Sequence, residues 1–272
     1  MSRWPTIALC SALVVAAVGV AGGARAATSH HDSPVVSQAS AAQPAALGDG
    51  TTESKYVAVG PCRLVDTRLK GGRIGIGKTR AYKVRGTGTA FANQGGKANG
   101  CGIPAAASSI QATITAVAAT GSGYLKAYTG SAVPQATFLN FTKLFNISNG
   151  GAVAVCAAAC ASDVRISVYG HSTNVVVDVQ GYYIKPMFAY VRYAGGLLPG
   201  RSSRVVGASY DSATGIYRVQ FDRDITHCVF GTTNVSPGVI LFDNPDGATA
   251  VFRFQTTGGM IADGDFLVTA TC

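Results

Sequence analysis

The chain is poor in the residues from which enzymes usually build an acid or a base. It has 13 Asp and Glu among 272 residues, Glu53 is its single glutamate, and only four histidines are present. A glycosidase would therefore need two aspartates as its carboxylate pair. The motifs GxSxG and HExxH and a phosphate-binding glycine loop do not occur. The sequence predicts a protein that is not an enzyme and needs no cofactor.

Long apolar runs are also scarce, with one exception near the start. Arg3 is followed by an apolar run over 7–20 and then by Ala24-Arg25-Ala26. This order is typical of a secretory signal peptide with a small-x-small cleavage site, so we expect 1–26 to be removed. No later run is apolar and long enough for a transmembrane helix. We therefore expect a secreted, extracellular product. Association of this product with the cell envelope is a further expectation.

Removal of the leader leaves an even number of cysteines. An even number in an exported chain predicts disulfides. A zinc site is disfavoured, because the closest pair has no second close pair and no histidine at zinc-finger spacing. We predict no metal site and assign all six remaining cysteines to disulfides: Cys62, Cys101, Cys156, Cys160, Cys228 and Cys272.

Composition and charge divide the rest of the chain into three parts. Residues 27–54 have almost no large apolar side chain and are predicted to be a disordered tether. Residues 55–186 contain 14 Lys and Arg against three Asp, whereas 187–272 contain six against seven. We expect a basic domain at 55–186 and a smaller, neutral module at 187–272.

Both parts consist of short runs in which apolar and polar residues alternate, a pattern typical of strands with one buried face. This spacing indicates a sandwich or a barrel. We predict an all-β protein, with a jelly-roll-like β-sandwich first and a smaller β-sandwich second. The expected strands are 56–59, 80–84, 110–117, 124–128, 137–141, 152–155, 164–169 and 175–183, then 189–193, 203–209, 215–221, 228–232, 239–242, 250–255 and 266–270.

Several motifs in the first part occur in a familiar order. They are Pro61-Cys62-Arg63-Leu64-Val65-Asp66-Thr67-Arg68, Cys101-Gly102-Ile103-Pro104-Ala105, Gly123-Tyr124-Leu125, Leu139-Asn140-Phe141 and Asp178-Val179-Gln180-Gly181-Tyr182-Tyr183. Over 61–183 the chain resembles a family of secreted bacterial β-domains that begin with Pro-x-Arg-x-x-Asp-Thr-Arg and end with Asp-Val-x-Gly-Tyr. The biochemical role of that family is undefined, so the resemblance implies architecture and location only.

The resemblance also implies a pairing of Cys62 with Cys101, and Cys156 with Cys160 would then close a loop between strands. The chain departs from the family at 144–146, where Leu-Phe-Asn replaces a frequent Arg-Ala-Asn turn. The second part is loosely similar to small β modules of secreted and tail-fibre-like proteins. That similarity suggests a pairing of Cys228 with Cys272.

Positive charge is the strongest functional signal in the sequence. Eight cationic residues fall within 23 positions, and part of this stretch is a glycine-rich segment that we expect to be an exposed loop. Such a cluster favours an anionic partner. For an exported protein we expect an anionic polysaccharide or another cell-envelope polymer, and no nucleic-acid-binding module is visible. The alternative is a charged surface that only aids solubility. The candidate ligand-binding residues are Arg63, Arg68, Lys70, Arg73, Lys78, Arg80, Lys83 and Arg85.

Other polar groups have a structural interpretation beside a functional one. Asp66-Thr67-Arg68 could hold a polar ligand, but we expect Asp66 to fix a turn by pairing with an arginine. Asp178 lies in an apolar run that looks like a strand buried on both faces, and it needs a partner there. A catalytic triad at His171 is disfavoured, because Gly170-His171-Ser172 is typical of a hairpin turn.

Two further groups are ambiguous in the same way. Residues 243–247 (Asp-Asn-Pro-Asp-Gly) could contribute to a calcium loop but are predicted to form a turn. The strand tyrosines could stack on sugars but are expected to pack within the protein: Tyr124, Tyr128, Tyr169, Tyr182 and Tyr183.

Three functional hypotheses follow. The first is a secreted, non-catalytic binding or adhesion protein whose basic domain contacts anionic envelope glycans. The second is a structural protein that forms a homo-oligomer through its C-terminal module. The third is an extracellular hydrolase, which would lose its activity when Asp66 or His171 is replaced.

Overall fold

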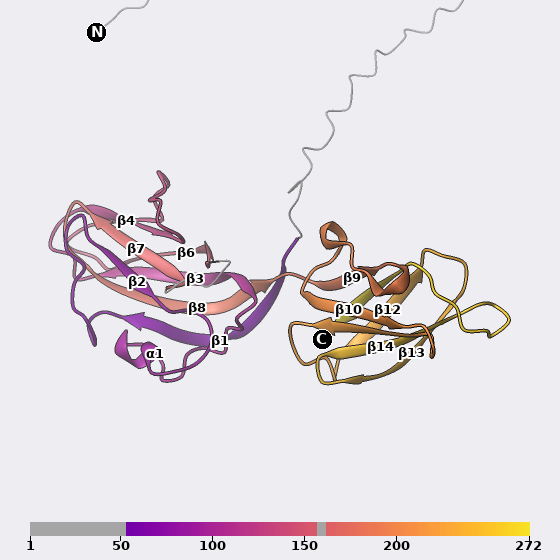
Figure 1. Cartoon of the computed structure of the whole chain (residues 1–272). Coiled ribbons are helices and arrows are strands. Elements are labelled where there is room, and N and C mark those ends of the chain that lie inside the picture. Colours follow the sequence, from indigo (N-terminus) through magenta and orange to yellow (C-terminus); the bar gives the residue numbers. More distant parts are fainter. Residues whose placement is uncertain (1–52, 157–161) are drawn as a thin grey trace, which may run out of the picture. The chain divides into compact units, whose positions relative to one another are not determined.

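The computed structural model describes residues 53–156 and 162–272. The expected signal peptide and all but the last two residues of the expected tether lie outside this range. The described residues form fifteen strands in four antiparallel sheets, together with one short helix, α1 (Ala90–Asn93), and two single 3₁₀ turns (Figure 1). The predicted all-β class is confirmed.

The strands up to residue 184 form two four-stranded sheets. Their orders are β1-β8-β3-β6 and β2-β7-β4-β5, which is the strand order of a jelly roll. The predicted jelly-roll-like sandwich is therefore confirmed. The strands are β1 (Lys55–Asp66), β2 (Thr79–Tyr82), β3 (Ala107–Val117), β4 (Gly123–Tyr128), β5 (Leu139–Phe141), β6 (Ile147–Ala154), β7 (Val164–Tyr169) and β8 (Asn174–Ile184).

Alternation along β3 shows why this sandwich forms. Ile110, Ala112 and Ile114 are almost fully buried, while Gln111 and Thr113 between them stay partly exposed. Because successive side chains of a strand point to opposite faces, the apolar set meets the facing sheet. The core is mainly aliphatic, with its members contributed by both sheets.

The strands from residue 187 onward form a second sandwich of three and four strands. Its sheets have the orders β12-β15-β9 and β10-β11-β14-β13. The strands are β9 (Met187–Val191), β10 (Val205–Asp211), β11 (Ile216–Phe221), β12 (Val229–Asn234), β13 (Val239–Asp246), β14 (Thr249–Gln255) and β15 (Phe266–Thr271). Its core is aromatic, with five fully buried rings: Tyr217, Phe221, Phe252, Phe254 and Phe266.

Every expected strand overlaps an observed one, but the first strand is longer than expected. The sequence predicts a strand over 56–59, whereas β1 continues through Pro61 to Asp66 beside β8. It does so with two register irregularities, between Ala58 and Cys62 and between Arg63 and Val65. Such bulges absorb extra residues without ending the pairing, so the Gly60-Pro61 break does not stop the strand.

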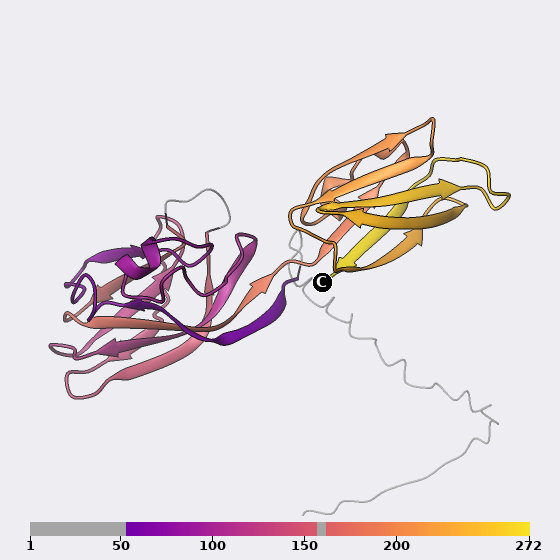
Figure 2. The ribbon, with the colours of Figure 1, turned by 90° about the horizontal axis from the view of Figure 1, so that it is seen from below.

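The helix α1 was not expected from the sequence. Phe91 anchors it in the core with 1% exposure, and α1 lies beside β1 at the lower side of the first sandwich in Figure 1 and towards the viewer in Figure 2. The chain after it contacts the strand directly, because the Asp66 amide donates to the Gln94 carbonyl oxygen at 3.0 Å. A Cβ on Gly96 would clash with the Leu64 carbonyl oxygen, so this close approach requires glycine.

Two disulfides close loops within the two sandwiches. Cys62 is bonded to Cys101, and Cys228 is bonded to Cys272, as predicted. Cys160 lies outside the described residues, so its pairing with Cys156 stays a prediction. Disulfides of this kind indicate an oxidising, extracellular environment. In the described part of the chain, no helix has the length and apolar character needed to cross a membrane.

Candidate functional site

Two of the eight candidate cationic residues are engaged by aspartates beside β1. The Arg63 guanidinium donates to both oxygens of Asp178, at 2.8 and 3.0 Å, and also to Asp66 at 3.2 Å. Arg68 donates to both oxygens of Asp66, at 2.9 and 2.6 Å. Two cations and two anions thus neutralise one another. Hydrogen bonds from Arg68 lower the pKa of Asp66 although burial of this carboxyl opposes the shift.

The Asp66-Thr67-Arg68 segment is held entirely by groups of the protein. Asp66 accepts the backbone amide of Arg68 at 3.1 Å. Thr67 Oγ1 accepts the Val175 amide at 2.8 Å and donates to Asn174 Oδ1 at 3.3 Å. Asp66 and Thr67 are each 1% exposed. These contacts fix the end of β1 against the start of β8.

Asp178 does not lie in a strand that is buried on both faces. Val177 and Val179 are buried, whereas the Asp178 side chain is 30% exposed. The pleat of β8 turns Asp178 outward, where Arg63 reaches it. The apolar run misleads because only its first part, 175–177, is buried throughout.

Arg85 is engaged by the third aspartate of the basic region. Its guanidinium donates to Asp163 Oδ1 at 3.0 and 2.7 Å, while Oδ2 accepts the Val84 and Arg85 amides at 2.7 and 3.0 Å. Burial alone would raise the pKa of Asp163, but these hydrogen bonds outweigh burial and lower it. Arg85 therefore joins the start of β7 to the chain after β2.

Arg80 and Arg73 organise the loop between β1 and β2. The Arg80 guanidinium donates to the Gly72 and Arg73 carbonyl oxygens at 2.6 and 2.9 Å. Arg73 Nε donates to the Ala118 carbonyl oxygen at 3.1 Å. The Ala118 amide donates in turn to Asn146 Oδ1 at 3.1 Å. The loops 67–78 and 142–146 therefore meet at one residue.

Four loops gather at this end of the first sandwich: 67–78, 118–122, 142–146 and 170–173. Besides the contacts at Ala118, Ile74 and Thr173 exchange two backbone hydrogen bonds, of 2.8 and 3.3 Å. The Thr120 amide donates to the Ser172 carbonyl oxygen at 2.9 Å. We call this surface the loop end. It lies opposite Ile184, where β8 finishes.

Besides Arg68, which pairs with Asp66, the loop end brings together three of the predicted cations and adds a fourth. Lys70, Arg73 and Lys78 are exposed there, and Lys143 joins them from the loop 142–146. Within the described ranges, the ammonium groups of the three lysines make no hydrogen bond or ion pair. Lys143 was missed because it is distant in sequence. The exposed loop between two expected strands was the only signal that could have found it.

Lys83 lies apart from the loop end. It follows β2, whose first residue, Thr79, is the one next to the loop end. The Lys83 backbone amide donates to Gln94 Oε1 at 3.1 Å, and its carbonyl oxygen accepts Gln94 Nε2 at 2.8 Å. The eight candidates thus do not form one patch: three are engaged by aspartates, Arg80 supports a loop, and Lys83 is remote.

His171 and the segment 243–247 also have structural surroundings. Residues 243–246 belong to β13, so the predicted turn is wrong for them and only Gly247 lies in the turn before β14. His171 lies in the turn between β7 and β8, with Nδ1 at 2.9 Å from the Ser122 carbonyl oxygen. Asp246 pairs with Thr249 across the turn from β13 to β14. Among residues 53–156 and 162–272, no group of three or more His, Cys, Asp or Glu side chains could hold a metal ion.

Tyrosines cluster on the outer face of β4 and β7. Tyr124 and Tyr169 stack with their centroids 5.0 Å apart and an interplanar angle of 16°. Lys126 Nζ lies 5.9 and 5.6 Å from these two rings and donates to the Pro134 carbonyl oxygen at 2.6 Å. The rings therefore contact each other and a lysine rather than standing free.

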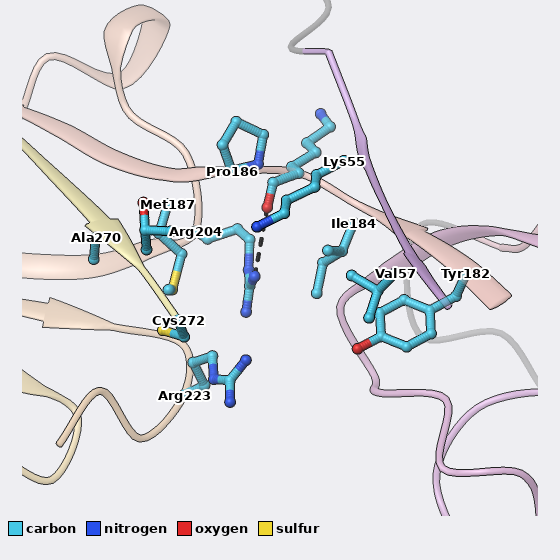
Figure 3. A pocket seen from close by; sticks show the side chains of 12 residues that line it. Lys55, Val57, Tyr182, Ile184, Pro186, Met187, Arg204, Arg223, Ala270 and Cys272 are labelled. Carbon is cyan, nitrogen blue, oxygen red and sulfur yellow. Dashed lines mark hydrogen bonds between the residues drawn. The ribbon is translucent and has the colours of Figure 1, made fainter. Parts of the chain in front are cut away.

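A further group of cations surrounds the segment between β8 and β9. Figure 3 shows Lys55, Arg204 and Arg223 there, with a dashed line from Arg204 to the Lys185 carbonyl oxygen, 3.4 Å away. Arg204 also forms an ion pair with Asp222 at 2.7 Å. Its charge is balanced, unlike that of the loop-end lysines.

No protein-family model matches this chain, and no curated protein matches it by sequence.

Proposed function

We propose that this chain is a secreted, non-catalytic binding protein that attaches to anionic cell-envelope polymers through the loop end. The observation that carries the proposal is the group Lys70, Arg73, Lys78 and Lys143, exposed on adjoining loops. Three of these side chains have no charged or hydrogen-bonding partner in the described part of the chain. Polyanions bind such unpaired cations by releasing counterions.

The distribution of acids supports the same proposal. Residues 55–186 contain only three carboxylates, and each one is engaged by an arginine. A polyanion approaching the loop end therefore meets no free carboxylate on its loops. The family resemblance over 61–183 and the leader-like 1–26 segment favour an extracellular setting, as do the two disulfides.

The test is binding of the purified protein to immobilised acidic and neutral polysaccharides across a salt series. Dextran sulfate serves as the acidic probe and unmodified dextran as the neutral one. We expect saturable binding to the acidic probe that weakens steeply as salt rises. The variant Lys70→Gln/Arg73→Gln/Lys78→Gln should weaken this binding strongly.

A matched variant separates local charge from net charge. Lys55→Gln/Lys83→Gln/Lys97→Gln removes the same total charge from exposed lysines outside the loop end. We expect it to bind nearly as well as the parent. Equal losses in the two variants, or no binding by the parent at low salt, would refute the proposed site.

A second candidate function, self-assembly, is favoured by the second sandwich. β12 and β13 are edge strands of their sheets, and they carry exposed apolar side chains: Val229 is 75% exposed, Leu241 46% and Phe242 44%. Edge strands with apolar side chains are sites of pairing with another chain. A second copy of the chain would cover them in a symmetric oligomer.

Sedimentation across a concentration series tests this candidate. We expect the mass of the parent to rise with concentration and that of Phe242→Asp to stay at one chain. The matched control is Val133→Asp, which introduces the same charge at a similarly exposed apolar position, in a loop outside the second sandwich. A parent that remains monomeric at every concentration would exclude the candidate.

A further inference from the structure

The loop end is apolar as well as cationic. Leu69 is 69% exposed, Ile76 60%, Leu144 79% and Phe145 66%. Elsewhere in the described part of the first sandwich, the only exposed large apolar side chains are those of Tyr56 and Val133. Contact with a hydrated polyanion would not bury these apolar side chains. An exposed apolar group of this kind marks an interaction surface.

The two features alternate along the same loops. Leu69 adjoins Lys70, Ile76 lies two residues before Lys78, and Lys143 directly precedes Leu144 and Phe145. The loops 67–78 and 142–146 both bond to Ala118, so their tips belong to one end of the sandwich. Each apolar tip therefore has a cation beside it.

We infer that the loop end docks on an anionic lipid surface, with the apolar tips entering the interface and the cations contacting the headgroups. Apolar side chains bind the boundary between headgroups and acyl chains, and Lys and Arg add attraction to anionic lipids. The inference rests on the proposed function for the role of the cations and names a partner that also accounts for the apolar tips.

Charge complementarity favours a lipid surface over a protein partner. The loops 67–78, 118–122, 142–146 and 170–173 contain no acidic residue. A protein partner would usually meet both signs of charge across such an area. The chain enters and leaves this sandwich at its opposite end, where Lys55 at the start of β1 pairs with Ile184 at the end of β8.

The test compares vesicles with a soluble polyanion. The purified protein is titrated with vesicles of phosphatidylcholine, with vesicles of phosphatidylcholine and phosphatidylglycerol, and with dextran sulfate. We expect binding to the anionic vesicles and not to the neutral ones. Leu144→Ser/Phe145→Ser should weaken binding to anionic vesicles by about tenfold or more, since two large apolar groups are lost. Its binding to dextran sulfate should not change.

The control Val133→Ser/Val206→Ser removes two exposed apolar side chains outside the loop end and should bind vesicles like the parent. A fluorescence probe adds a direct readout. The single tryptophan, Trp4, lies in the expected signal peptide, so Phe145→Trp supplies the only indole of the cleaved protein. Its emission should shift to the blue on anionic vesicles, whereas that of Val133→Trp should not.

The outcomes separate this inference from the proposed function. Salt-sensitive binding to dextran sulfate without binding to anionic vesicles would overturn the inference and leave the proposed function standing. Vesicle binding that is unaffected by Leu144→Ser/Phe145→Ser, or an unshifted Phe145→Trp emission, would do the same. Binding to neither probe would overturn both.

Discussion

The two sandwiches stabilise themselves with different side chains. The first has a mainly aliphatic core, and all three of its carboxylates engage arginines. The second has an aromatic core, in which the Phe266 ring contacts the rings of Tyr217 and Phe252. The comparison shows that the acids of the first sandwich are used up in structural pairs. The remaining cations leave an excess of positive charge on its surface. The second sandwich has no such excess, since it contains six cations and seven acids.

The disulfides are the feature in which the two sandwiches should be equal. The bridges span 39 and 44 residues, and loop-closure entropy assigns about 4 kcal/mol to each. We expect Cys62→Ala/Cys101→Ala and Cys228→Ala/Cys272→Ala to lower the free energy of unfolding of their own sandwich by similar amounts. Amide hydrogen exchange in β3 and β11 measures each sandwich separately. Losses that differ severalfold would break the parallel.

The ion pairs are the feature in which the sandwiches should differ most. Asp163 is 1% exposed and accepts four hydrogen bonds. Asp163→Ala would leave Arg85 without its charged partner and two amides without their acceptor, and we expect a loss of about 3 kcal/mol. In the second sandwich Asp222 is 29% exposed beside Arg204, so Asp222→Ala should cost about 1 kcal/mol. Denaturant unfolding compares them.

The same aspartate sets part of the acid sensitivity. The pKa of Asp163 is lowered in the folded state. The carboxylate therefore makes its full contribution to the free energy of unfolding above the pKa of the unfolded state, about 4. This contribution is lost as the pH falls from there through the folded-state pKa. The stability of Asp163→Ala should therefore fall less steeply below pH ~4 than that of the parent. If stability falls with equal steepness below pH ~4 in Asp163→Ala and in the parent, Asp163 does not contribute to it.

A buried tyrosine should make the second sandwich sensitive to alkali. Burial raises the pKa of Tyr217 to about 12, and its hydroxyl accepts the Gly264 amide at 3.1 Å. The contribution of the neutral phenol is complete below pH ~10 and is lost as the pH rises towards about 12. Tyr217→Phe should lose about 1 kcal/mol at neutral pH and show a shallower alkaline limb. Tyr193→Phe, at a 59% exposed ring, should change neither.

The smallest effect is expected at the exposed ion pair of the first sandwich. The Arg63 and Asp178 side chains are 42% and 30% exposed, so solvent screens their attraction. We expect Arg63→Gln to cost less than about 1 kcal/mol, since Asp66 keeps Arg68 as a partner. A loss as large as that of Asp163→Ala would show that the network beside β1 acts as a unit.

Alternation of apolar and polar residues was sufficient to predict all fifteen strands, because each strand has one face on a core. It failed where the signal is not periodic. β1 crosses Gly60-Pro61 by means of bulges, which depend on the pairing with β8. α1 has four residues and one core contact, through Phe91, too short for a helical stripe.

The candidate site was predicted less well, since a count of cations does not show their partners. A pairing of Asp66 with an arginine was expected, and it is made locally by Arg68. The pairings of Arg85 with Asp163 and of Arg63 with Asp178 join residues far apart in sequence. They depend on which strands the jelly roll makes neighbours. Lys143 reaches the loop end for the same reason.

The adjacency of β1 and β8 has a consequence for how this sandwich is carried. Lys55 lies opposite Ile184, so the chain arrives and departs on neighbouring strands. A unit whose two ends lie side by side can be inserted into a surface turn of another protein without stretching its host. The geometry of the first sandwich therefore suits insertion as a unit into another protein, where it would present the same four loops.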